Sequence, residues 1–135
     1  MKDKLLELHK NSYARYSNYQ VSAIVVMNDG KEFCGVNVEN ASYGATICAE
    51  RSAIVSAVSA GYKVGDFKEL HVMVSSGEIG MPCFMCRQVI SEFFGKDCDV
   101  YCYDTHGRVE VYKVEEICPF PFGSDDLVWN VDLLV

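Results

Sequence analysis

The sequence contains no long apolar run. No stretch approaches the ~20 consecutive apolar residues that a membrane-spanning helix needs. Residues 1–17, MKDKLLELHKNSYARYS, also lack the continuous apolar core of a secretory signal, because charged and polar residues interrupt them throughout. We therefore expect a cytoplasmic protein that does not associate with a membrane.

Basic residues are scarce as well. The chain has 12 Lys and Arg against 19 Asp and Glu, which gives a formal net charge of -7. Proteins that bind nucleic acid draw much of their affinity from phosphate neutralisation by Lys and Arg, so this balance disfavours DNA, RNA and anionic membranes as partners. It favours a small ligand that is uncharged or cationic.

Internal repeats, low-complexity segments and linkers are missing too. The length of 135 residues, half of them hydrophobic, fits one compact domain spanning residues 1–135. In the first half of the chain, residue patterns predict a helix over 3–16, two strands within 20–40 joined by an NDG turn, and a helix over 47–60 that Gly61 ends. In the second half they predict a strand over 69–76, a helix from Pro82 to about Phe94 that Gly95 ends, strands over 98–105 and 108–114, and a helical turn near 114–119. This order predicts an α/β fold with a five-stranded mixed sheet in a three-layer α/β/α arrangement.

The seven cysteines do not predict a disulfide framework. Their number is odd, and cytoplasmic thiols stay reduced. Four of them are expected to pack as small hydrophobic residues, because they lie in strand-like or apolar contexts. These four are Cys34, Cys98, Cys102 and Cys118.

The other three cysteines lie at predicted helix starts. PCFMC places Cys83 and Cys86 three residues apart on the first turn of one helix, and Cys48 opens another. Helix N-termini favour the thiolate, which is the form that binds metal. Three thiolates facing one another predict a zinc site with one open position, which normally carries water. A redox pair is disfavoured because no thioredoxin-like strand pattern leads into it. A structural site with a fourth cysteine ligand stays open.

Two charged residues follow Cys48. Glu50 can reach a water molecule lying off the helix end, where it would take the water's proton and pass it to a leaving group. Arg51 would offset the negative charge of three thiolates on one zinc ion and help the water to ionise. The alternatives are that Glu50 only interacts with the helix dipole and that Arg51 is an ordinary surface cation.

The pattern C-x-E followed by P-C-x-x-C is the three-cysteine signature of zinc deaminases. The segments DGKEFCGVNVEN, NVENASYGATICAERSA, PCFMCRQVISEF and FGSDDL closely resemble those of the homotetrameric cytidine deaminases. The likeness extends from YSNYQVSAIVV to SDDL. It implies the cytidine-deaminase-like fold, one zinc ion per subunit, a homotetramer, and hydrolysis of cytidine or 2′-deoxycytidine to uridine or 2′-deoxyuridine plus ammonia, a step of pyrimidine salvage.

The resemblance also implies roles for the metal-site residues. Cys48, Cys83 and Cys86 match the zinc ligands of the family. Glu50 matches the residue that protonates N3 of the base, takes the proton of the attacking water and delivers a proton to the departing amine. A Glu50→Gln variant is therefore expected to keep zinc and to lose turnover by orders of magnitude.

Further matches concern the substrate. Asn37 and Glu39, in NVEN, match a pair that binds the ribose 3′-hydroxyl, and they project on the same side of an extended strand end. Tyr19 matches an aromatic residue that stacks on the pyrimidine. Three more positions match residues that a neighbouring subunit contributes to the site, so a monomer is expected to be nearly inactive. These are Ala41, Tyr43 and Phe122.

The chain departs from the family pattern in places that bear on substrate preference. Tyr19 stands where phenylalanine is usual, Phe84 and Met85 where small residues are usual, and Met81 where serine or threonine is common. CPFPF replaces the more usual Leu-Pro-Gly-Ala-Phe around Phe122.

Three other functions compete with this interpretation. Deaminases of a modified nucleoside such as blasticidin S share the fold and the zinc site, but they differ at NVENASYG and at the arginine after C-x-E, which this chain retains. A non-catalytic binding module stabilised by zinc would require four protein ligands. Deamination within RNA or DNA is disfavoured because a basic, aromatic-lined channel is not evident.

Overall fold

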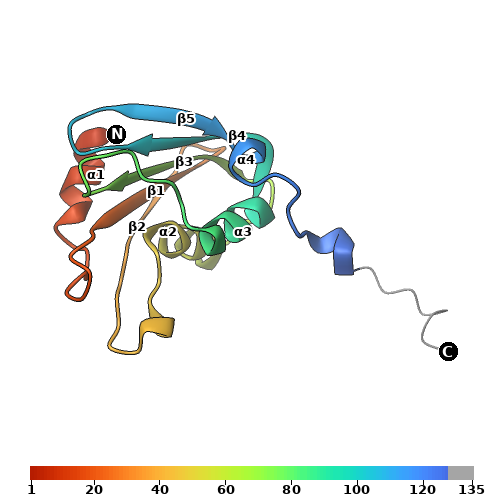
Figure 1. Ribbon diagram of the computed structural model, residues 1–135. Helices are drawn as coiled ribbons and strands as arrows, with labels where there is room; N and C mark the ends of the chain where they lie inside the picture. Colours follow the sequence, from red (N-terminus) through yellow and green to blue (C-terminus); the bar gives the residue numbers. More distant parts are fainter. Residues whose placement is uncertain (128–135) are drawn as a thin grey trace.

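The computed structural model describes residues 1–127, which form one mixed five-stranded sheet with the strand order β2-β1-β3-β4-β5 (Figure 1). β3 and β4 run parallel, and the other neighbouring pairs are antiparallel. The strands are β1 Val21–Met27, β2 Glu32–Val36, β3 Phe67–Val74, β4 Phe94–Tyr103 and β5 Val109–Lys113. The predicted five-stranded mixed sheet is thereby confirmed. Residues 128–135 of the expected domain lie outside the described part.

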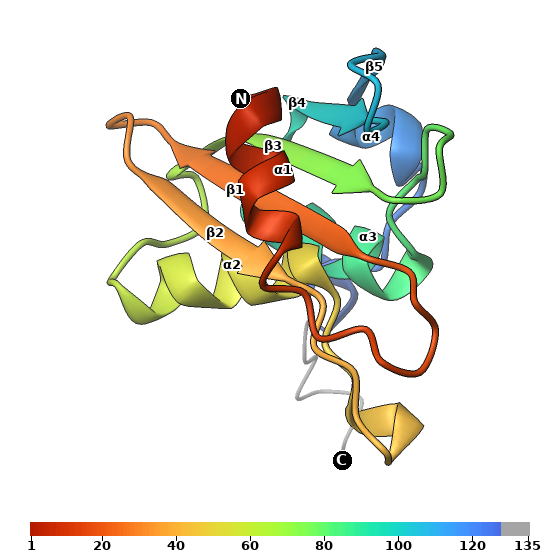
Figure 2. The ribbon, with the colours of Figure 1, turned by 90° about the vertical axis from the view of Figure 1, so that its left-hand side faces the viewer.

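Helices cover both faces of this sheet. α1 (Lys2–His9) lies on one face, and α2 (Ala49–Ser59) and α3 (Phe84–Phe93) lie on the other (Figure 2). The short helix α4 (Val114–Ile117) packs beside α3 and β4, and two 3₁₀ turns complete the elements: η1 (Tyr43–Ala45) and η2 (Ser124–Leu127). The three-layer α/β/α arrangement is as predicted. None of the helices in the described residues is long and apolar enough to cross a membrane.

The core follows from this layering. Every residue of β1 is buried, because this strand lies inside the sheet with side chains covered on both faces. The larger apolar cluster lies between the sheet and α2, α3 and α4. A smaller cluster joins Leu5 of α1 to Ile24, Val26 and Met73 of the sheet.

The first helix is shorter than predicted. It ends at His9, because the following residues leave the helix to pair with the segment after β2. The N–H of Tyr13 donates to the carbonyl of Asn37 at 3.0 Å, and the N–H of Glu39 donates to the carbonyl of Tyr13 at 2.9 Å. Tyr13 therefore belongs to a bridge with Val38 and not to the apolar face of a helix.

Three smaller expectations were also wrong. α3 begins at Phe84 with Cys83 as its N-cap, so Pro82 precedes the helix and does not occupy its first position. β4 begins at Phe94, directly after α3, and not at residue 98 as predicted, whereas the end of α3 at Phe93 is within one residue of the predicted end. Cys34 is exposed on the edge strand β2, whereas Cys102 is buried in the core as expected.

Candidate metal centre and substrate pocket

The metal-binding thiols meet where the N-termini of α2 and α3 converge. Cys48 is the N-cap of α2 and Cys83 is the N-cap of α3, both with extended backbone. Cys86 is buried in the first turn of α3. The Sγ atoms of these three residues all lie within 4.8 Å of one another, and those of Cys48 and Cys83 are 3.8 Å apart.

This spacing fits a tetrahedral zinc ion. Zinc–sulfur bonds of about 2.3 Å at tetrahedral angles place two sulfurs about 3.8 Å apart. Among residues 1–127 the group holds no fourth ligand atom from a cysteine, histidine or carboxylate. The predicted three-cysteine zinc site is confirmed, and the alternative with Cys34, Cys98, Cys102 or Cys118 as a fourth ligand finds no support in the described residues.

A glycine in β2 allows α2 to lie directly on the sheet. A Cβ atom at Gly35 would come within 2.5 Å of the backbone nitrogen of Ala53, and closer still to the carbonyl oxygen of Ala49. Only a residue without a side chain permits this approach. The contact lies at the first turn of α2, so it sets the position of Cys48 and Glu50.

Glu50 is the buried carboxyl group of the site. It is 5% exposed, and its Oε2 lies 3.6 Å from the Sγ of Cys86, which donates to it. Burial raises the pKa of Glu50 to about 7. A carboxyl group with such a pKa can both accept and release a proton near neutral pH.

Arg51 lies against the same thiols. Its Nη2 donates to the Sγ of Cys48 at 3.5 Å. The pKa of Cys48 is lowered by a hydrogen bond from Cys86 and, to a smaller extent, by the Arg51 guanidinium. The arrangement favours thiolate at Cys48, which agrees with the charge-balancing position expected for Arg51.

A cavity of about 230 Å³ opens next to this centre. Four of its lining residues were predicted as substrate or catalytic residues: Tyr19, Asn37, Glu39 and Glu50. The other lining residues are Val21, Thr46, Cys48, Val74, Met81 and Cys83. Val21, Thr46 and Val74 were not predicted as site residues. Their apolar or small side chains carried no chemical signal, and only the strand pairing brings them to the cavity.

Asn37 and Glu39 are held by the loop that precedes β1. Asn37 Oδ1 accepts the N–H of Val21 at 3.0 Å and the Ser12 hydroxyl, and its Nδ2 donates to the carbonyl of Tyr19 at 2.7 Å. The Glu39 carboxylate accepts the N–H of Tyr16 at 2.9 Å, the N–H of Ser17 at 3.1 Å and the Ser17 hydroxyl. These bonds hold both side chains and the Tyr19 backbone in one unit.

Three of the predicted substrate-binding residues do not line the cavity within the described chain: Ala41, Tyr43 and Phe122. Tyr43 is 77% exposed and contacts Tyr16 edge-on, beside a neighbouring hollow that shares Glu39 and Thr46 with the cavity. Phe122 is 56% exposed, on the segment that follows α4.

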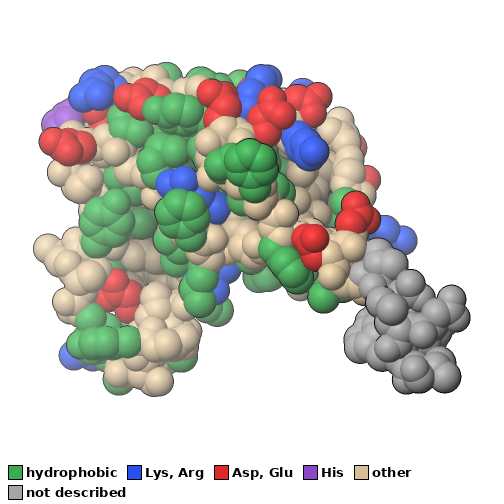
Figure 3. Space-filling model, turned by 45° about the vertical axis from the view of Figure 1, so that its right-hand side comes forward, with side chains coloured by type: hydrophobic (Ala, Val, Ile, Leu, Met, Phe, Trp, Pro, Cys, Tyr) green, Lys and Arg blue, Asp and Glu red, His purple; other side chains and the backbone are tan. Residues whose placement is uncertain are grey.

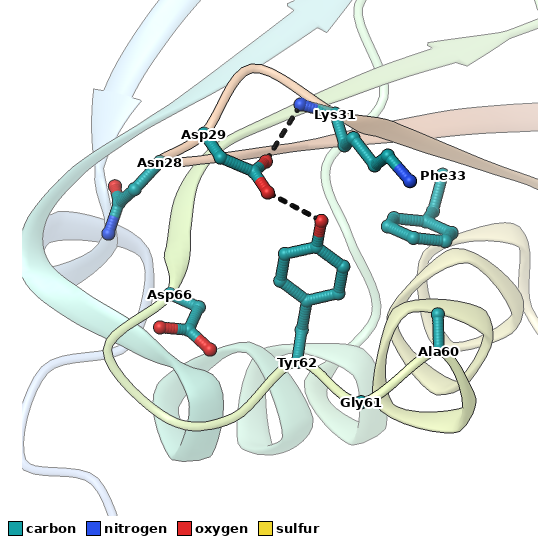
Figure 4. A pocket seen from close by; sticks show the side chains of 8 residues that line it. All are labelled: Asn28, Asp29, Lys31, Phe33, Ala60, Gly61, Tyr62 and Asp66. Atoms are coloured by element: carbon teal, nitrogen blue, oxygen red, sulfur yellow. Dashed lines mark hydrogen bonds between the residues drawn. The ribbon is translucent and has the colours of Figure 1, made fainter.

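A larger hollow of about 460 Å³ lies at the other end of α2 and holds no predicted site residue (Figure 4). Its polar groups largely satisfy one another. The hydroxyl of Tyr62 donates to Asp29 at 2.6 Å, and the N–H of Lys31 donates to the same carboxylate at 3.0 Å. Size alone therefore does not identify the site, whereas the chemistry of the side chains does.

Comparison with known proteins agrees with this geometry. Residues 1–102 match the family model described as the cytidine and deoxycytidylate deaminase zinc-binding region. The chain belongs to this deaminase family. A cytidine deaminase from Halalkalibacterium halodurans is 36% identical over 122 residues, which cover 90% of this chain and 91% of that protein. The crystal structure of a cytidine deaminase from Burkholderia pseudomallei superposes with a TM-score of 0.85 at 40% identity and covers 89% of this chain and 94% of that one.

A second kind of deaminase also shows similarity. A blasticidin-S deaminase from Bacillus cereus is 30% identical over 114 residues, which cover 78% of this chain and 79% of that protein. Its identity and coverage are both lower than those of the Halalkalibacterium halodurans relative. The comparison thus ranks the two deaminase types in the order expected from the NVENASYG motif.

Proposed function

We propose that the chain hydrolyses cytidine and 2′-deoxycytidine to uridine and 2′-deoxyuridine with release of ammonia. The observation that carries the proposal is the buried Glu50 carboxyl group beside the three-thiolate centre, in a cavity that also holds Asn37 and Glu39. The names of the relatives support the same reaction. The reducing cytoplasm would keep the three thiols available for metal.

In this reaction Glu50 moves the protons. Cys48, Cys83 and Cys86 would hold zinc, which would supply a nucleophile at neutral pH because it lowers the pKa of bound water to about 7. Glu50 accepts a proton from that water and delivers it to N3 of the cytosine ring. After the water oxygen has added to C4, Glu50 would accept the remaining proton of that oxygen and donate it to the amine as the C4–N bond breaks, which restores the carboxylate. Its burial serves both steps, because a pKa near 7 lets one carboxyl group act first as base and then as acid.

The cavity walls would bind the nucleoside. Tyr19 would present its ring to the pyrimidine, and Asn37 and Glu39 would bind the 3′-hydroxyl of the sugar. The bonds that hold these two side chains to the Tyr16–Tyr19 backbone place base-binding and sugar-binding groups on one rigid unit. An uncharged substrate suits the acidic chain.

We further propose a homotetramer in which neighbouring subunits complete the sites. The exposed positions of Ala41, Tyr43 and Phe122 support this arrangement, since these residues need a second chain to reach a cavity. Large apolar side chains are visible on the surface of one chain (Figure 3). Two of the exposed ones, Phe84 and Met85, lie on α3 beside the metal ligands. Size-exclusion chromatography with light scattering tests the assembly, and a stable, fully active monomer would contradict it.

The deamination itself is tested on the purified protein with cytidine, following the ultraviolet change on conversion to uridine. We expect conversion that is lost when a strong chelator removes zinc and that returns when zinc is added back. Blasticidin S is run in parallel and is expected to be the poorer substrate. A zinc-loaded protein that converts blasticidin S but not cytidine would favour the alternative. Failure on both substrates would point to a different amino-bearing compound.

A further inference from the structure

The segment 82–86, which carries two of the metal-binding thiols, is called the metal-binding turn here. The Arg87 side chain contacts three parts of the molecule around it. Its Nε–H donates to the carbonyl of Pro82 at 2.7 Å, and its Nη1–H donates to the carbonyl of Ile117 at 3.0 Å. Its guanidinium carbon lies 4.3 Å from the centre of the Phe84 ring. A planar guanidinium can make two directed bonds and one stacking contact at once, which an ammonium cannot reproduce.

The bond to Pro82 adds to two other contacts at the start of α3: the Pro82 side chain is buried, and the N–H of Arg87 donates to the carbonyl of Cys83 at 2.9 Å. Cys83 is the N-cap of α3, but its side chain makes no capping hydrogen bond, and the residue is exposed. The exposed Cys83 side chain is therefore positioned through its backbone. The Pro82 carbonyl belongs to the peptide that leads into Cys83, so the Arg87 bond contributes to fixing the backbone from which that thiol projects.

The next residue holds the segment that follows α4. Nε2 of Gln88 donates to the carbonyl of Phe122 at 2.8 Å. Together with the bond from Arg87 to Ile117, adjacent side chains of α3 hold both ends of residues 117–122. Both acceptors are backbone carbonyls, so these bonds do not depend on the side chains of the unusual CPFPF run.

We propose that Arg87 and Gln88 are positioning residues that set the metal-binding turn and the Phe122 segment relative to each other. Arg87 fixes Cys83 through the Pro82 carbonyl. Gln88 fixes the segment that presents Phe122. The part concerning Gln88 rests on the proposed function, whereas the part concerning Arg87 is tested by zinc binding alone.

Zinc affinity is the first readout. Competition with a chromophoric chelator is expected to show that Arg87→Gln binds zinc about 10–100-fold more weakly, the usual effect of removing a group that orients a metal ligand. Arg87→Lys is expected to fall between this variant and the parent. Arg108→Gln, which removes an exposed arginine from the hairpin between β4 and β5, serves as the matched control and keeps the parent affinity. Circular dichroism checks the fold, and if Arg87→Gln does not fold, Arg87→Lys decides. A folded Arg87 variant with parental zinc affinity would overturn this part.

The KM and kcat values for cytidine are the second readout. Gln88→Ala is expected to keep parental zinc affinity and to raise KM about tenfold with a smaller change in kcat, because only the placement of Phe122 changes. Glu92→Gln, exposed on the same helix, is the control. Parental KM in Gln88→Ala would overturn the Gln88 part. If the parent protein itself leaves cytidine unchanged, the proposed function fails, while the zinc affinities still decide the role of Arg87.

Discussion

The metal centre is assembled by a single chain, whereas the substrate pocket is proposed to need residues from a neighbouring chain. The three thiolates and the Glu50 carboxyl group converge within one chain, on the first turns of two helices packed against the sheet. The residues expected to close the substrate pocket lie on two projecting segments, around η1 and after α4 (Figure 1). Tyr43 and Phe122 on these segments are exposed.

This difference has a physical cause. A metal site tolerates errors of only a few tenths of an ångström in its ligand positions, so its ligands belong on rigid elements whose backbone is fixed by packing. A substrate must enter and leave, and residues from another chain can cover it without obstructing the metal. A substitution among the metal ligands or at Glu50 should therefore impair the site of the chain that carries it. A substitution on a projecting segment should impair the site of a neighbouring chain.

The largest effect is expected at the metal side. Glu50→Gln keeps the shape of the side chain but cannot accept and return a proton, so kcat should fall roughly 10²–10⁴-fold. Zinc content, measured by atomic emission, should stay at the parental level, because Glu50 is not one of the ligands. Glu115→Gln, exposed on α4, is the control. A Glu50→Gln variant with parental turnover would refute the assigned role.

A smaller loss of activity, at the site of a neighbouring chain, is expected from substitutions on the projecting segments. Phe122→Ala should lower kcat/KM by about tenfold through loss of an aromatic contact with the substrate. Co-expression of Phe122→Ala with Glu50→Gln should give mixed assemblies that are more active than either variant alone. Some sites would then combine an intact Glu50 with a neighbour's intact Phe122.

A control pair of variants tests whether the recovery of activity depends on which residues are changed. Glu50→Gln co-expressed with Cys83→Ser should show no recovery, because both defects fall in the part of the site that one chain supplies. Recovery in this pair, or its absence with Phe122→Ala, would contradict the division between the two sides.

The metal centre could be predicted from the sequence more fully than the substrate pocket. Cysteine, glutamate and arginine carry their chemistry in their side chains, so Cys48, Glu50, Cys83 and Cys86 could be named before their positions were known. The strand and helix order followed from the residue patterns, although the first helix was predicted too long because its bridge to Val38 is a long-range contact. The role of Val74 in the pocket could not be predicted, because an apolar side chain looks alike in a core and in a cavity wall.

Gly35 is the clearest case of a site residue without a chemical signal, and its replacement is expected to act on stability and zinc affinity and not directly on the chemical step. Gly35→Ala would force the first turn of α2 away from β2, since the added methyl group meets backbone atoms that cannot rotate aside. We expect a loss of about 1–3 kcal/mol in the free energy of unfolding, measured by urea denaturation. Gly95→Ala is the matched control, because its Cβ would meet only the Cys98 sulfur at an ordinary 3.6 Å. Since the displaced turn carries Cys48, zinc affinity should fall with stability in Gly35→Ala and stay unchanged in Gly95→Ala. Equal stability and zinc affinity in the two variants would mean that the helix adjusts freely and that the close contact does not position the metal centre.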